Sequence, residues 1–134
     1  MIKCETIGMI DSAKLNPVLK IDAAVENYSF KTVDGDLYLI ANTLTGDDAG
    51  REGVVFAAGE LLNGWLVKAW EGQKLVIDAK HVTGGIGSIE KNAILVAGED
   101  GKLKTGSATG VHLVVTDVKA HLTEAAIKAK VVVA

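Results

Sequence analysis

The stretch GELLNGWLVKAWEGQKLVIDAKH, residues 59–81, holds both tryptophans of the chain and two glycine turn signals. Its alternating pattern predicts two strands joined by a three-residue loop at positions 70–72, with Gly72 in the left-handed conformation that such loops need. One face of this hairpin is almost wholly apolar, and its expected pairs are Ala69 with Gln73, Val67 with Leu75 and Trp65 with Ile77. A shift of one residue would bring lysines into that face, so the pattern selects this register. The stretch therefore predicts a β-scaffold and indicates no chemistry.

Two Asp-Gly pairs predict further hairpins with two-residue turns. The first, Asp34-Gly35, joins two strands within residues 28–42. One face of this hairpin is mainly apolar (Thr32–Leu37, Phe30–Leu39, Tyr28–Ala41), and the other is half polar (Lys31–Tyr38, Ser29–Ile40). The second, Asp100-Gly101, joins two strands within residues 93–104 and places Glu99 opposite Lys102.

Shorter apolar segments complete the expected sheet. Strands are predicted at 2–6, 18–21, 54–57 and 111–116, with polar or glycine-rich loops at 43–53 and 82–88. The C-terminal segment fits two patterns: Leu122 and three alanines have helical spacing, whereas the residues from Ala126 onward alternate and end in β-branched valines, which favours a strand. The sum is one all-β domain over residues 1–134, a compact antiparallel sandwich or barrel of about 8–10 short strands with at most one or two short helical turns.

The composition excludes several classes of protein. The net charge is −3 and no basic stripe is present, which argues against a nucleic-acid partner. The longest apolar runs fall well short of the roughly 20 residues that a membrane span needs, and the N-terminus lacks a signal-peptide pattern. We therefore expect a protein made in a cytoplasm and not inserted in a membrane. A single cysteine, Cys4, excludes a disulfide framework.

Candidate chemical groups are few and each has a simpler interpretation. Cys4 lacks a flanking signature of a nucleophile, and the histidines, at positions 81, 112 and 121, show no zinc-ligand spacing. Asp47 and Asp48 lie in a glycine loop and could hold calcium, although turn and capping roles explain them equally well. The sequence Gly84-Gly85-Ile86-Gly87 lacks the lysine of a phosphate loop and is interpreted as a loop. We expect no catalytic residue, no metal and no cofactor.

Three residues are predicted to be exposed apolar contacts with a partner. Tyr38 and Ile40 lie on the half-polar face of the first hairpin, and such a face suits contact between subunits. Trp70 is expected at the tip of the central hairpin, where an exposed aromatic side chain is a candidate for a protein contact.

Most of the chain resembles a group of small tailed-phage virion proteins of the head-decoration or head-fibre type. The resemblance lies in DGDLYLIANTLTGDDA (34–49), in NGWLVKAWEGQKLVI (63–77), in the opening MIKCETIG and in the ending TEAAIKAKVVVA. It implies a structural protein in the virion, on the outside of the head, which binds the major capsid protein or other virion proteins. It also implies no enzymatic activity and a homo-oligomer, for which a trimer is one closed arrangement. No functional residue of the family can be carried over to this chain.

Two other functions are consistent with the sequence. A small ligand- or glycan-binding β-module is suggested by Trp70 and by the Asp47-Asp48 loop. A hydrolase whose site is assembled across loops is the weakest alternative, because no nucleophile and base occur together.

Overall fold

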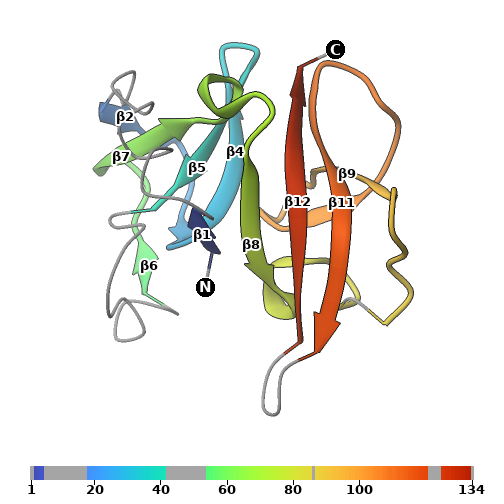
Figure 1. Ribbon diagram of the computed structural model, residues 1–134. Coiled ribbons are helices and arrows are strands. Elements are labelled where there is room, and N and C mark those ends of the chain that lie inside the picture. Colours follow the sequence, from blue (N-terminus) through green and yellow to red (C-terminus); the bar gives the residue numbers. More distant parts are fainter. Residues whose placement is uncertain (1, 5–17, 42–53, 86, 121–124, 134) are drawn as a thin grey trace.

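The computed structural model describes residues 2–4, 18–41, 54–85, 87–120 and 125–133 (Figure 1). This part of the chain contains two short 3₁₀ helices, η2 (Val67–Trp70) and η3 (Ala79–His81), and no longer helix. Its twelve strands are β1 (Ile2–Cys4), β2 (Val18–Lys20), β3 (Val25–Glu26), β4 (Ser29–Val33), β5 (Asp36–Ile40), β6 (Val55–Phe56), β7 (Leu61–Leu66), β8 (Lys74–Asp78), β9 (Ile94–Ala97), β10 (Leu103–Thr105), β11 (Val111–Ala120) and β12 (Ala125–Val133). The all-β class is confirmed. The strands outnumber the expected eight to ten because several, such as β3 and β6, have only two or three residues.

The strands form three antiparallel sheets. The largest has the order β1-β8-β12-β11-β9-β10, the second has the order β2-β7-β5-β4, and β3 pairs with β6 alone. Figure 1 shows the four-stranded sheet on the left and the six-stranded sheet on the right. Sequence neighbours such as β7 and β8 thus belong to different sheets.

The main core lies between the two larger sheets. Phe30 and Leu39 of the four-stranded sheet belong to the same buried cluster as residues of the other sheet. The latter are Ile2, Leu75, Ile77, Leu95, Leu103, Leu113, Val115, Ile127, Ala129 and Val131. Alternate residues of β12 enter this cluster, as the alternating pattern from Ala126 onward predicts, and the prediction of a C-terminal strand is confirmed.

A second, smaller core covers the other face of the four-stranded sheet. Ile21, Ile40 and Leu62 are buried there, and Tyr38, Val25 and Phe56 pack against them. Tyr38 is opposite Lys31, and Ile40 is opposite Ser29, as the sequence predicts. The four-stranded sheet is therefore covered on both faces. The sequence had predicted that the half-polar face with Tyr38 and Ile40 would be open to solvent or to a partner.

The Asp34-Gly35 turn is confirmed in position and register. Thr32 is opposite Leu37 and Phe30 is opposite Leu39 in the ladder of β4 and β5. Both turn residues have positive φ, 51° and 83°, which is the geometry of the two-residue turn favoured by Asp-Gly. Local turn chemistry is sufficient to define this hairpin.

The predicted hairpin of residues 59–81 is wrong. The β7 strand pairs with β2 and β5, and β8 pairs with β1 and β12, so Val67 does not face Leu75. Residues 67–70 form η2, and Gly72 does adopt the left-handed conformation, with a φ of 80°. The turn is a corner that takes the chain from one sheet to the other. The β8 strand pairs with β12 instead of β7, and Leu75 lies opposite Ala129 in this ladder.

The second Asp-Gly hairpin is confirmed in place but not in register. Leu103 pairs with Ala97, and the Gly98 N–H donates to the Lys102 carbonyl at 2.7 Å, so Glu99 does not face Lys102. The loop has three residues, 99–101, and ends on Gly101 with a φ of 84°. An Asp100 carboxylate oxygen accepts a hydrogen bond of 3.0 Å from the Lys102 N–H, which stabilises this wider turn.

Candidate functional site

The predicted contact residues are less exposed than the sequence indicated. Ile40 is 1% exposed and Trp70 is fully buried, so their predicted exposure is wrong. Tyr38 is half-buried against the smaller core. Trp70 is buried because η2 turns it into the main core instead of presenting it at the tip of a hairpin.

The two tryptophans form one structural unit. Their rings stack with centroids 6.2 Å apart and an interplanar angle of 21°. The Trp65 indole N–H donates to the Ala41 carbonyl at 2.7 Å, which ties the corner to the end of β5. Trp70 is fully buried and offers no exposed platform for a sugar or a base, and so it no longer supports glycan binding.

The candidate site is a groove between the outer edge of β4 and the turn that joins β9 to β10. It comprises two adjoining cavities of about 510 and 170 Å³. The larger cavity has three walls, formed by residues 22–26, residues 29–32 of β4, and residues 97–101. The smaller one shares Glu26, Ser29, Asp100 and Gly101 with it and extends to His81.

The edge of β4 presents backbone groups to this groove. A two-residue turn makes Val33 and Asp36 a hydrogen-bonded pair, and pairs alternate along an antiparallel ladder. The N–H and C=O groups of Phe30 and Thr32 therefore point away from β5. The Phe30 N–H indeed donates to the Gly101 carbonyl across the groove at 2.9 Å. Thr32 lies two residues further along the same edge.

The walls of the larger cavity carry an excess of negative charge. They contain the carboxylates of Asp22, Glu26, Glu99 and Asp100 and a single cation, Lys31, a formal balance of −3. Lys31 Nζ lies 2.5 Å from Asp22 Oδ1. This hydrogen bond and the charge of Lys31 lower the pKa of Asp22 below its usual value. Asp22 is therefore ionised at neutral pH and paired with Lys31.

The groove narrows where Gly101 meets Ser29. A Cβ atom added at Gly101 would lie 2.9 Å from both Cβ and Oγ of Ser29, closer than side chains approach one another. The Ser29 hydroxyl donates to the Glu26 carbonyl at 2.6 Å, which fixes its position. The absence of a side chain at residue 101 thus allows the two sheets to meet here.

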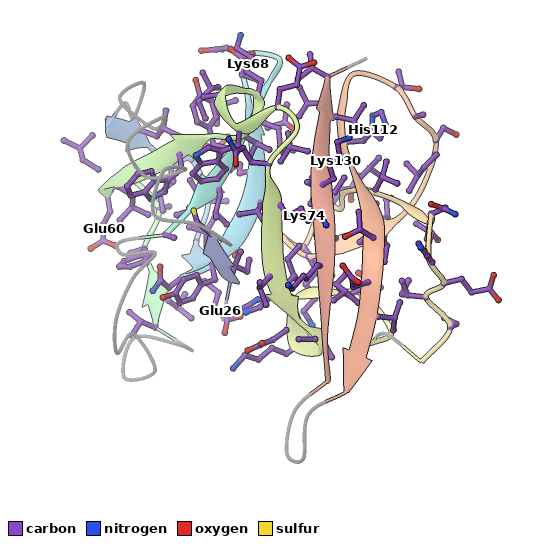
Figure 2. All side chains as sticks on the ribbon, in the orientation of Figure 1. Glu26, Glu60, Lys68, Lys74, His112 and Lys130 are labelled. Atoms are coloured by element: carbon purple, nitrogen blue, oxygen red, sulfur yellow. The ribbon has the colours of Figure 1, made fainter. Side chains whose placement is uncertain are left out.

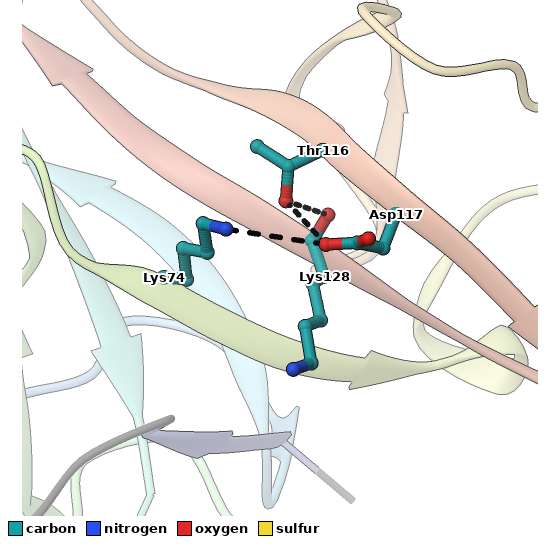
Figure 3. Close-up of polar contacts among 4 residues, drawn as sticks. All are labelled: Lys74, Thr116, Asp117 and Lys128. Atoms are coloured by element: carbon teal, nitrogen blue, oxygen red, sulfur yellow. Dashed lines mark hydrogen bonds and ion pairs between the residues drawn. The ribbon is translucent and has the colours of Figure 1, made fainter.

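The outward face of the six-stranded sheet carries paired lysine side chains, in contrast to the acidic walls of the groove. Lys74 stands directly opposite Lys130, and Figure 2 shows both with His112 over this sheet. The Lys74 Nζ atom lies 4.0 Å from Asp117 Oδ2 (Figure 3). The Thr116 hydroxyl donates toward the same carboxylate at 3.1 Å and toward the Lys128 carbonyl at 3.3 Å. These contacts link β11 to β8 and β12 at the point where the β11–β12 register shifts between Val115 and Asp117.

The cysteine and the histidines of the described residues do not gather into a reactive cluster. Burial raises the pKa of the Cys4 thiol to about 11, which disfavours the nucleophilic thiolate. His81 packs against Tyr28 with ring centroids 6.0 Å apart, and His112 Nδ1 lies 2.9 Å from the Gly110 carbonyl. Among the described residues, no three His, Cys, Asp or Glu side chains gather as metal ligands. The remaining candidates, Asp47, Asp48 and His121, lie outside the described residues.

Three exposed aliphatic side chains lie close together in the sequence. Val54, Val55 and Leu61 are 41%, 63% and 67% exposed, and they lie in one short segment around β6 and the start of β7. Figure 2 shows Glu60 of the same segment at the outer left of the molecule. The sequence did not single out these residues, because alternation within a two-residue strand cannot reveal which side is covered.

Comparisons with protein families, curated proteins and solved structures gave no significant match. In the described part of the chain, neither 3₁₀ helix has the length or apolar character required to cross a membrane.

Proposed function

We propose that the chain is a structural protein of a phage virion, which binds the outside of the head as a decoration or head-fibre component. Residues 34–49 and 63–77 carry the resemblance that suggests this class. The structural observation that supports it best is the exposure of Val54, Val55 and Leu61, three aliphatic side chains that lie close together in the sequence. Burial of such side chains against a partner contributes roughly 25 cal/mol per Å² of apolar surface.

The proposed mechanism is binding without chemistry. The partner is the major capsid protein or another virion protein, and a standard interface would bury about 800 Å² on each side. A decoration protein must match the symmetry of its lattice, and so we expect a closed homo-oligomer such as a trimer. The exposed segment 54–61 is a surface that a capsid or a second copy would cover.

The test is binding to heads assembled without this protein. We expect the purified chain to be oligomeric by light scattering and to co-sediment with matching heads, with its position visible by electron microscopy. A Val55→Glu, Leu61→Glu double variant should lose the interaction, because it charges the aliphatic surface. Val118→Glu is the matched control, since Val118 is also exposed, at 44%, but lies on β11. A monomer that leaves matching heads bare would refute the proposal.

A ligand-binding β-module is the second candidate function, and the groove favours it. A cavity of about 510 Å³ falls in the size range of small-molecule sites. A glycan array and a calcium titration, both with saturating ligand, would test this alternative. Absence of any response in either assay would remove it.

A further inference from the structure

We propose that the groove accepts an extended, positively charged segment of a partner polypeptide, which adds as a strand to the outer edge of β4. This proposal does not depend on the identity of the protein as a virion component. It rests on the geometry of the strand edge, on the space beside it and on the charge of the walls.

The first argument is the strand edge. In the described part of the chain, β4 is the last strand of its sheet and pairs only with β5. The outward N–H of Phe30 already donates to the Gly101 carbonyl, which shows that backbone from another segment can approach this edge. The N–H and C=O of Thr32 face the same side, where one residue of an added antiparallel strand could satisfy both.

The second argument is space. The walls beside the edge contain residues with small side chains or none, namely Ala23, Ala24, Ala97, Gly98 and Gly101. A strand needs about 4.8 Å of lateral room for its backbone, which walls with larger side chains would fill. The cavity of about 510 Å³ therefore suits a main chain lying along Thr32.

The third argument selects the charge of the occupant. Four carboxylates and one lysine line the larger cavity, so lysine or arginine side chains on the added strand would be attracted, and acidic ones repelled. A bare metal ion fits less well, because no three ligand side chains converge in the described residues. A sugar also fits less well, because the aromatic residues that line the groove, Phe30 and Tyr28, are 1% and 2% exposed and offer no face for stacking.

The experiment uses a short peptide of alternating lysine and valine, about six residues long, acetylated and amidated at its ends. Binding to the full chain is followed by amide NMR shifts and by titration. We expect shifts at Thr32, Glu99 and Gly101, and weaker binding as salt rises. A peptide with glutamate in place of lysine should not bind. A lysine-valine peptide that is N-methylated at alternate residues keeps its charge but cannot pair, and should also fail.

Variants separate pairing from simple charge attraction. Thr32→Pro removes the outward N–H at an edge position where proline is tolerated, and should weaken binding about tenfold, the effect of one lost hydrogen bond. Thr32→Ala keeps the N–H and should bind within about twofold of the native chain. The Glu26→Gln, Glu99→Gln double variant should weaken binding and flatten its salt dependence. Unchanged binding by a folded Thr32→Pro variant, equal binding of the methylated peptide, or shifts confined to another surface would overturn the proposal.

Discussion

Replacement of Gly101 by alanine should lower the stability of the protein more than the same replacement of Gly35, the glycine of the other Asp-Gly turn. Gly101 has a φ of 84°, and its carbonyl accepts the Phe30 N–H at 2.9 Å. An alanine Cβ would lie 2.9 Å from Cβ and Oγ of Ser29. Ser29 is buried and its hydroxyl is bonded to Glu26, so it cannot move aside without further loss.

Two contributions set the size of the effect. A non-glycine residue in the left-handed region costs about 1–2 kcal/mol. Overpacking of a close contact adds about 1–3 kcal/mol. We therefore expect Gly101→Ala to lower the free energy of unfolding by about 2–5 kcal/mol.

Gly35→Ala is the matched control. Gly35 has nearly the same φ, 83°, but an added Cβ would have no atom within 4 Å. Its cost should therefore be the backbone contribution alone, about 1–2 kcal/mol. The difference between the two variants measures the contact at Ser29.

Urea unfolding of both variants, followed by tryptophan fluorescence, provides the measurement. The signal is sensitive to unfolding because Trp70 is fully buried and stacked on Trp65. Equal losses of stability for Gly101→Ala and Gly35→Ala would refute the close approach of the β9–β10 turn to β4, and with it the shape of the groove.

Three further results are expected. Trp70→Ala should lower the free energy of unfolding by about 3–5 kcal/mol in urea titrations, because it empties the largest buried position; a loss below about 1 kcal/mol would contradict its place in the core. Cys4, with a pKa raised from 9.0 to about 11, should react with a disulfide reagent at pH 8 about 100-fold more slowly than a free thiol. The thiol of the unfolded chain ionises at a lower pH than the buried thiol, so the free energy of unfolding should be unaffected below pH 9 and should fall as the pH rises toward 11. A reaction rate that levels off near pH 9 would contradict the raised pKa of Cys4. Lys130→Glu should raise the free energy of unfolding by about 0.2–1 kcal/mol, because it replaces the repulsion between Lys130 and the opposite Lys74 by an attraction. No change in the free energy of unfolding at low salt would contradict the register of β8 and β12.

The sequence predicts local features well and non-local ones poorly. Asp34-Gly35 defines its hairpin because both φ angles and the strand twist are set by the two residues themselves. Gly72 also has its predicted left-handed conformation, yet the flanking strands diverge. A glycine turn is compatible with a hairpin and with a corner, and only the distant partners β12 and β5 distinguish them.

The candidate site could not be predicted from the sequence for the same reason, because it depends on contacts between distant segments. Alternation places Ile40 on the half-polar face of β5, but nothing in that pattern shows that Ile21 and Leu62 cover it. The groove was missed because its walls come from three separate segments. Asp-Gly turns locate Asp100 near a hairpin end, yet the approach of that turn to Ser29 and Phe30 depends on how the two sheets pack.

The position of β8 has a consequence for biosynthesis. This strand lies between β1 and β12 in the large sheet, and its pairing with β12 joins Leu75 to Ala129. A ribosome adds about 5–20 residues per second, so β8 emerges several seconds before its second neighbour exists. During that interval one edge of an apolar strand stays uncovered, and this nascent state is the point at which chaperones or aggregation can act on the chain.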